Sequence, residues 1–503
     1  MKYVYIVFAL LFLVACNSQV PTDYMASRSK PDIYPDYKDV TIPVNMAPLT
    51  FEMSAEADEM VARYTIGDEE LIVSGPTIRP DADDWKHMVE KANGKAIKVE
   101  VFACYENQWT GYKPFHIYVS PDSIDSHLSY RLIPPSYISY EELTINQRCL
   151  ENYDESVIYD NMLCSTESKG QCINCHNYQQ YRPERMQFHA RQNLGGTVIA
   201  YDGVVRKINM KNDSILSAGV YPTWHPWLKL IVYSTNKTAQ SFFIVSSDKI
   251  EVYDTESDLI AYDVEKNEIT NIENDPNEFE VFPFWAPDGK TLYYCSAHFE
   301  YTDSTKDDKE LITRCKEVKY NIYKKSFDPE TMQFGERELV FDAAAHGKSA
   351  TFPRISPDGR WLVFTLGNHG VFHIWHHDAD LWMMDLQSGK VRSVDEVNSP
   401  DTESYHSWSS NGRWMVFSSR RNDGDFTRPF FTHVDRNGKC TKPFELPSSN
   451  PDYHRQFMKC YNIPEFMKGA VTIKPQEFAD VLKEDGIPVK YVPRLTTANM
   501  TEE

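Results

Sequence analysis

Phe352-Pro353-Arg354-Ile355-Ser356-Pro357-Asp358-Gly359 is the stretch that decides the predicted fold of this chain, because three related stretches accompany it. In Pro-Asp-Gly, the proline presets a turn, the aspartate caps it and the glycine adopts the left-handed conformation that closes a hairpin. A short apolar strand follows each stretch. The related stretches are Tyr221-Pro222-Thr223-Trp224-His225-Pro226, Phe282-Pro283-Phe284-Trp285-Ala286-Pro287-Asp288-Gly289 and Tyr405-His406-Ser407-Trp408-Ser409-Ser410-Asn411-Gly412. We therefore expect a series of repeated antiparallel hairpins.

This pattern resembles the TolB-like, WD-repeat-like β-propeller, over residues 185–475. From the four clear copies and two weaker ones we expect five or six blades, with six favoured, and a C-terminal tail at 476–503. The repeats lie farther apart than the ~40 residues usual for a blade, so we expect insertions around 236–250 and 299–318. Weaker copies of the repeat are expected at 186–197 and 455–461.

The region before the repeats also has the pattern of strands. Residues 97–101 alternate apolar and polar side chains, a pattern that continues in spacing to Ala103, and short apolar runs at 115–119 and 130–133 are separated by turn residues. We interpret 40–140 as a β-sandwich-like domain and 141–184 as a connector rich in Cys and Asn. The predicted fold class is therefore all-β, with a sandwich followed by a propeller.

The N-terminus predicts the compartment. Lys2 precedes an apolar run at 4–14, which is too short to span a bilayer. Leu13-Val14-Ala15-Cys16 resembles the lipobox of bacterial lipoproteins, which implies a signal peptide at 1–15, a lipid on Cys16 and a tether at 16–39. The alternative is an ordinary signal peptide followed by a chance cysteine. Asn17 in place of Asp favours the outer membrane, and the layout as a whole resembles TolB-like lipoproteins of Bacteroidetes type.

Composition excludes two classes of protein. The chain has 503 residues, of which 41% are apolar and 13% aromatic, so it can build packed cores and is not disordered throughout. Its net charge of −21 argues against nucleic acid as a partner. No hydrolase or transferase motif is present in the sequence. The absence of such motifs does not decide the question, and whether the chain is an enzyme is left open.

The sharpest short motif is Cys172-Ile173-Asn174-Cys175-His176. C-x-x-C-H is the attachment sequence of c-type haem, in which two thiols form thioethers and the histidine binds the iron. Met162, Met186 and His189 are candidates for the sixth ligand, although Met186 also fits the core side of a strand. Two alternatives remain open: a zinc site that includes Cys164, and a pair of cysteines with a redox or structural role.

Two further clusters are candidates for binding. His369, His373, His376, His377, Asp378 and Asp380 could hold a metal ion, but packing at a blade edge is the favoured interpretation. A ligand pocket over the central channel is possible. Its candidate wall residues are His376, Asp378, Arg421, Asp423 and Arg428. Among the remaining cysteines, Cys295 and Cys315 are the most plausible disulfide.

Two main functional hypotheses follow. The first is a membrane-anchored propeller with one covalent c-type haem, used for electron transfer or haem-linked sensing. The second is a non-enzymatic scaffold at the cell envelope that binds protein or glycan and uses C-x-x-C-H structurally or for zinc. A hydrolase or lyase with its site in the channel is a third, weaker hypothesis. A protein partner at the envelope is expected in the first two cases.

Overall fold

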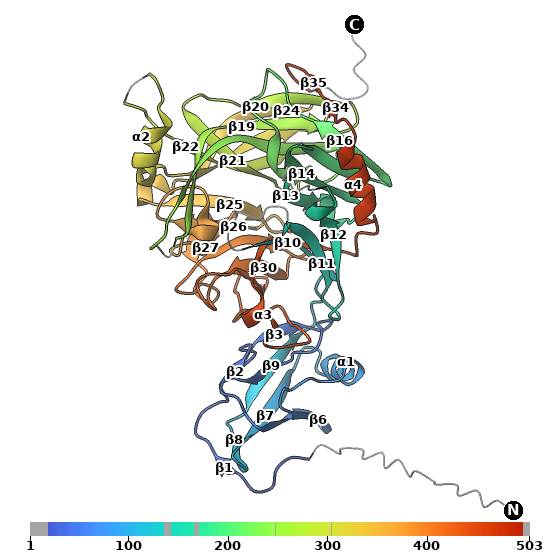
Figure 1. Cartoon of the computed structure of the whole chain (residues 1–503). Helices are drawn as coiled ribbons and strands as arrows, with labels where there is room; N and C mark the ends of the chain where they lie inside the picture. The colour runs from blue at the N-terminus through green and yellow to red at the C-terminus, as the bar shows by residue number, and fades with distance from the viewer. Residues whose placement is uncertain (1–18, 135–141, 165–170, 247, 303, 496–503) are drawn as a thin grey trace, which may run out of the picture.

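The computed structural model describes residues 19–134, 142–164, 171–246, 248–302 and 304–495. The predicted signal peptide and Cys16 lie outside these residues. Figure 1 shows a large propeller above a smaller N-terminal domain. Within the described part of the chain, no helix combines the length and apolarity that a membrane span requires.

The propeller consists of antiparallel four-stranded meanders in which each strand pairs with the next in sequence. The first three meanders are β13 (Gln171–Tyr178), β14 (Arg185–Gln192), β15 (Gly196–Tyr201), β16 (Val204–Asn209); β17 (Gly219–Trp224), β18 (Leu230–Phe242), β19 (Ile250–Asp263), β20 (Glu268–Glu273); and β21 (Glu278–Trp285), β22 (Thr291–His298), β23 (Asn321–Asp328), β24 (Gln333–Phe341). The next two are β25 (Ser349–Ile355), β26 (Trp361–Gly367), β27 (Asp380–Asp385), β28 (Val391–Ser393); and β29 (Glu403–Trp408), β30 (Trp414–Ser419), β31 (Arg428–His433), β32 (Phe444–Glu445).

The last sheet joins distant parts of the chain. Its inner strand is β33 (Cys460–Met467), which pairs with β10 (His127–Ile133), followed by β11 (Thr144–Cys149) and β12 (Glu155–Asp160). The inner strands β13, β17, β21, β25, β29 and β33 each contact the next, and β33 contacts β13. A C-terminal strand therefore closes the ring by pairing with strands from the N-terminal third of the chain.

The number of separate blades differs from the prediction. Within the described residues, four blades stand as separate sheets of four or five strands, not five or six. The two meanders from β17 to β24 are merged into one nine-stranded sheet, through a parallel bridge between Ser257 and Phe279. The cause is the expected insertion near 236–250, which lengthens β18 and β19 until β19 reaches β21.

A β-bulge recurs at the middle of every described inner strand. In each of the six, the pairing register shifts around one residue with a left-handed φ between 47° and 56°. These residues are Cys175, Tyr221, Phe282, Phe352, Tyr405 and Ile463. Neighbouring aromatic rings pack in the channel, as between Phe282 and Phe352, whose centroids are 3.8 Å apart. Left-handed φ is strained for such residues, so the surrounding ring must impose it.

The N-terminal domain is not a sandwich. Its seven strands form one sheet in the order β1-β8-β7-β5-β6, with β9 and β3 added beside β7. The strands are β1 (Met25–Ala26), β3 (Thr41–Pro43), β5 (Glu59–Ile66), β6 (Glu69–Gly75), β7 (Ala96–Tyr105), β8 (Gln108–Gly111) and β9 (Phe115–Ser120). The second sheet is only the pair β2 (Ile33–Tyr34) and β4 (Glu52–Met53).

Helix α1 (Ala82–Lys91) covers this sheet in place of a second layer of strands. Asp81 caps its first turn, and Trp85 packs edge-on against Tyr64, with ring centroids 6.0 Å apart. The strand expected at 130–133 exists, but it belongs to β10 in the propeller. Likewise, the segment expected to be a connector contributes β11, β12 and β13 to propeller sheets.

Contacts from the N-terminal domain and the chain's end hold the propeller from outside. Asp125 accepts hydrogen bonds from the backbone N–H and the hydroxyl of Ser410, both at 2.6 Å. Helix α4 (Pro475–Lys483) packs beside β12, while β34 (Ile487–Pro488) and β35 (Lys490–Tyr491) pair with β16 and β20. The described part of the segment interpreted as a tail, 476–495, therefore lies along the propeller's outer strands (Figure 1).

Candidate functional site

The C-x-x-C-H motif lies inside β13, the inner strand of its blade. The pairing with β14 skips Cys175 and His176, because the bulge falls between Asn174 and Asn177. Cys175 is therefore equivalent to the aromatic residues of the repeat, and His176 to the residue after them. That following residue is Pro222, Pro283, Pro353, His406 or Pro464 in the other inner strands. The motif is thus a divergent copy of the repeat.

Burial sets the chemistry of the motif. Cys175 and His176 are 3% and 1% exposed. Burial, reinforced by the charge of Arg131, lowers the pKa of His176 to about 3. Burial also raises the pKa of the Cys175 thiol. His406, the matching histidine of β29, likewise has its pKa lowered to about 3 by burial. Both histidines are neutral members of the channel core.

A haem does not fit this arrangement. A c-type haem needs both thiols and the imidazole around one porphyrin. Cys172 borders a cavity of about 680 Å³, whereas Cys175 and His176 border a void of about 20 Å³ at the centre of the ring. The three side chains therefore do not share a space of porphyrin size, and we derive no step through haem.

The expected additional ligands are also dispersed. Met186 is fully buried in the main propeller core, and Met162 is 55% exposed on a short turn. His189 borders the larger cavity, where Nδ1 lies 3.2 Å from the hydroxyl of Thr197 and burial lowers its pKa to about 3. Cys164 lies against α4, with its thiol 3.5 Å from the carbonyl oxygen of Ala479. No metal cluster forms from Cys164, Cys172, Cys175 and His176 in the described structure.

The predicted channel pocket does not form from its five candidate residues. Arg428 is buried and donates to the carbonyl oxygens of His454, Lys459 and Phe457. Arg421 pairs with Glu403 at 3.0 Å. The other candidates shape loops: Asp423 accepts from the backbone N–H groups of Asp425 and Phe426, and Asp378 accepts from that of Asn368.

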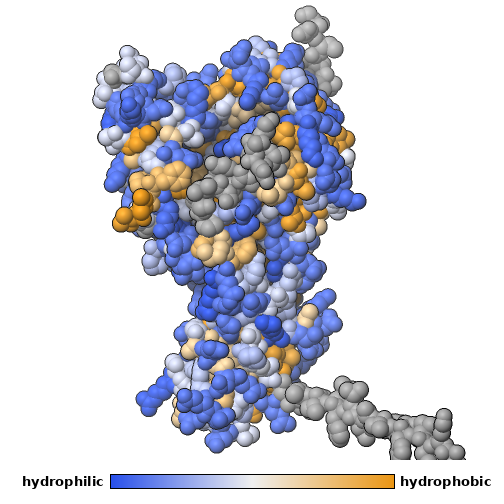
Figure 2. Space-filling model, in the orientation of Figure 1, coloured by the Kyte–Doolittle hydropathy of each residue, from blue (hydrophilic) through white to orange (hydrophobic). Residues whose placement is uncertain are grey.

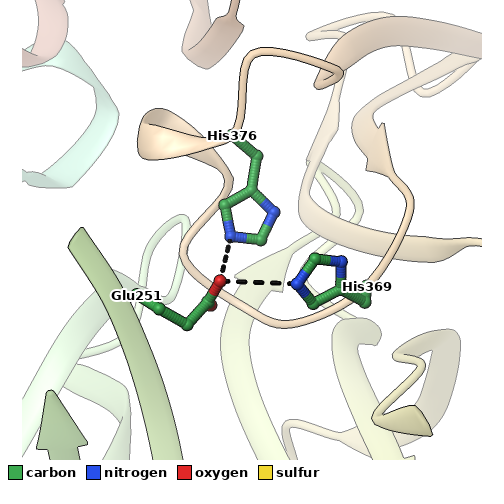
Figure 3. A group of neighbouring side chains, drawn as sticks. All are labelled: Glu251, His369 and His376. Atoms are coloured by element: carbon green, nitrogen blue, oxygen red, sulfur yellow. Dashed lines mark ion pairs between the residues drawn. The ribbon is translucent and has the colours of Figure 1, made fainter. Parts of the chain in front are cut away.

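His376, the fifth candidate, belongs to a cluster on the loop after β26. There, Glu251 of β19 lies between two histidines: its Oε2 is 2.9 Å from Nε2 of His376 and 3.4 Å from Nε2 of His369 (Figure 3). Burial raises the pKa of Glu251, but the two histidines outweigh it and hold that pKa at about 2. Sequence reasoning flagged the histidines and missed Glu251, which comes from a distant strand.

The disulfide expected between Cys295 and Cys315 is not formed. All nine cysteines in the described residues are free thiols. Cys295 is fully buried in β22, where burial raises its pKa, whereas Cys315 lies on a short turn after α2 (Asp308–Thr313).

The cavity of about 680 Å³ is the feature best suited to bind a ligand. It lies where the inner strands begin, and the lengthened hairpin of β18 and β19 forms one wall through Gln240, Phe242 and Ile250. Its described lining has two arginines, Arg131 and Arg191, together with the neutral His189, and no Asp or Glu. Its aromatic residues are Tyr221, Phe242, Phe372, Trp375 and Tyr405. This is unusual in a chain with a net charge of −21.

The hairpin that walls this cavity ends in an apolar tip. Ile244 and Val245 are 99% and 95% exposed, and Phe242 and Phe243 are 60% and 42% exposed. Figure 2 shows strongly apolar residues at the left edge of the propeller, on the side where this hairpin descends in Figure 1. Exposed apolar patches occur at the contact surfaces of proteins, so this tip is a candidate contact surface.

A second cavity, of about 490 Å³, lies where the inner strands end. Trp224, Trp285 and Trp408 border it but are only 3–5% exposed. Trp285 packs on Phe327 with ring centroids 5.0 Å apart. These tryptophans therefore serve blade packing, and we place the candidate binding site in the larger cavity.

The fold and this cavity define an all-β propeller protein with a basic cavity at one end of its channel. No known protein family matches the chain, and no curated protein matches it. Solved structures similar to it include TolB from Acinetobacter baumannii, which is 12% identical, with a TM-score of 0.42 over 77% of this chain and 85% of that chain.

Two propeller domains are also similar. That of the Trilobed protease from Pyrococcus furiosus is 12% identical, with a TM-score of 0.31 over 67% of this chain and 79% of that chain. That of Cps50 (Swd1) from Myceliophteria thermophila is 12% identical, with a TM-score of 0.28 over 65% of this chain and 88% of that chain. At such low identities the likeness concerns fold only, and the propeller assignment rests on the closed ring of strands.

Proposed function

We propose that this chain is a non-enzymatic binding propeller of the cell envelope, which holds an acidic, apolar segment of a partner protein in the cavity of about 680 Å³. The lipobox-like residues 13–16 support a lipid anchor at Cys16 and an outer-membrane location. The observation that carries the proposal is the basic lining of the cavity, which includes no described carboxylate.

The charges in the cavity favour an anionic ligand. Arg131 is held in place by bonds from its guanidinium to the carbonyl oxygen of Ile173 and the side chain of Asn462. Arg191 is exposed and forms no ion pair with any described residue. A fixed guanidinium and an unpaired one that line the same cavity can both bind a carboxylate.

The rim of the cavity favours a polypeptide over a glycan. Ile244 and Val245 are aliphatic and almost fully exposed, so they offer apolar contact and no hydrogen bonds. Phe242 belongs both to this tip and to the cavity wall. One extended segment could therefore place an acidic group inside and apolar side chains on the tip, as peptide-binding grooves do.

The test is fluorescence anisotropy with two pools of synthetic peptides that share Leu and Val content. One pool carries Asp and Glu, and the other carries Lys and Arg. We expect saturable binding of the acidic pool only, weakened at least tenfold by Arg191→Glu, because like charges then face each other. Arg182→Glu, at an exposed arginine that does not line the cavity, is the matched control. Equal binding of both pools, or equal losses in both variants, would overturn the proposal.

A further inference from the structure

We propose that Glu251, His369 and His376 form a binding site for a zinc-type divalent metal ion, which fastens the β18–β19 hairpin to the loop after β26. The three ligand atoms lie within 4.8 Å of one another. The site is separate from the binding cavity: Ile250 and Val252 of the same strand line that cavity, and Glu251 between them points away from it.

The donor set matches the chemistry of zinc. Two imidazoles and one carboxylate are a known set of protein ligands for zinc and for other transition metals. Metal bonds of about 2.0–2.1 Å in a tetrahedron place ligand atoms roughly 3.3 Å apart. The carboxylate-to-imidazole separations here are 2.9 Å and 3.4 Å. Figure 3 shows both rings, carried by one loop, turned towards the carboxylate.

An independent observation is the set of unpartnered atoms at this site. Glu251 is 5% exposed and His376 is 1% exposed. Among the described residues, Oε1 of Glu251 and Nδ1 of His376 form no hydrogen bond, and Nε2 of His376 has only the carboxylate of Glu251, at 2.9 Å. Buried polar atoms without partners are costly in free energy, and a bound cation would satisfy the carboxylate and Nε2 together.

The surrounding residues keep a space open beside these atoms. Gly370 has a φ of 73°, and a Cβ there would lie 3.1 Å from Oε1 of Glu251 and 3.3 Å from Cε1 of His376. His373 does not compete as a ligand, because Nδ1 lies 2.8 Å from the hydroxyl of Thr351 and Nε2 lies 3.1 Å from the carbonyl oxygen of His369. It therefore positions the loop that carries His369.

The test uses the full chain, stripped of metal with EDTA and titrated calorimetrically with zinc chloride at neutral pH. We expect one zinc ion per chain, with affinity at least tenfold weaker in Glu251→Gln and in His369→Gln, because loss of a direct ligand should cost no less than loss of its supporting contacts. His298→Gln is the matched control, since His298 pairs with Glu278 at 3.2 Å on the surface without a second histidine.

A second readout separates a metal site from a simple ion pair. If zinc joins the hairpin to the loop, saturating zinc should slow proteolysis at residues 242–252 in the wild type and leave Glu251→Gln unchanged. Circular dichroism of each metal-free variant checks that it is folded, and His369, which is less buried than His376, is the safer substitution. No saturable binding to the folded wild type, or equal affinity in Glu251→Gln, would overturn the inference.

Discussion

Cys175 and Phe352 occupy equivalent positions in two inner strands of the propeller, each as the left-handed residue of a β-bulge, with φ of 56° and 52°. The residue that follows is His176 in one strand and Pro353 in the other. Residues 172–176, which match the haem-attachment motif, are therefore a copy of the propeller repeat. In this copy, cysteine and histidine replace an aromatic residue and proline.

This equivalence predicts that His176→Pro is tolerated. Proline follows the left-handed residue in four of the six described inner strands, and the ladder between β13 and β14 does not use His176. We expect the free energy of unfolding to change by no more than about 1 kcal/mol, as for prolines at compatible positions. Chemical denaturation measures it.

Ile173→Pro is the control for that substitution. Ile173 pairs with Ala190 in the ladder and is fully buried, so proline there should disrupt a buried part of the ladder and cost about 1–3 kcal/mol. Equal damage from the two prolines would contradict the equivalence of the strands.

The apolar tip should contribute to peptide affinity but not to the stability of the fold. Ile244→Ser together with Val245→Ser removes side chains that are 99% and 95% exposed, so stability should change by less than about 0.5 kcal/mol. Affinity for the acidic, apolar peptide pool should nevertheless fall, as measured by anisotropy. A large loss of stability with unchanged affinity would show that the tip serves the fold.

Glu280 predicts a pH dependence of stability. It is fully buried in β21, and neither carboxyl oxygen has a hydrogen-bond partner in the described residues. Burial, together with the nearby carboxylates of Glu273, Asp258, Glu278 and Asp275, raises the pKa of Glu280 to about 9. An unfolded glutamate has a pKa of about 4.3, so the folded chain holds this proton more tightly.

Below about pH 4, Glu280 is protonated in both the folded and the unfolded chain, so it costs no stability there. As pH rises towards about 9, only the unfolded chain releases this proton, so the free energy of unfolding falls by at most roughly 1.4 kcal/mol per pH unit. Glu280→Gln should therefore gain stability relative to the wild type as pH rises from 5 to 9, in parallel urea titrations. A constant difference across that range would contradict the raised pKa.

Substitution of Arg428 should lower the stability of the fold without changing peptide affinity. It is 1% exposed and its guanidinium donates to several backbone carbonyl oxygens around α3 (Tyr453–Gln456). Arg428→Met should lower the free energy of unfolding by about 2–3 kcal/mol, because the carbonyls lose charge-assisted partners. Peptide affinity of the protein that remains folded should not change, whereas a ligand-binding role for Arg428 would lower it.

The sequence predicted the propeller because its repeat carries local signals. Pro-Asp-Gly turns and the strands that follow them depend on neighbouring residues, and both are visible in one stretch such as 352–365. The closing pair of β10 and β33 joins residues more than three hundred positions apart, and no local pattern indicates it. The strand at 130–133 was therefore assigned to the wrong domain.

The candidate sites show the same limit. Cys172, Cys175 and His176 have the spacing of a haem motif, but whether they share a space depends on a bulge imposed by the other inner strands. His369 and His376 stood out as a cluster, whereas Glu251 is brought to them only by the lengthened hairpin. The alternation at 97–103 and the apolar run at 115–119 indicated strands, but they did not indicate that α1 covers the sheet of these strands.

The most direct test of the account is a pyridine haemochrome spectrum of the full chain, residues 1–15 included, produced in a host that matures c-type cytochromes. The account predicts no c-type band, because Cys175 and His176 are members of the channel core and border a void of only about 20 Å³. A control cytochrome made in the same host must show its band. A c-type band from this chain that disappears in Cys175→Ala would contradict the structural role of the motif.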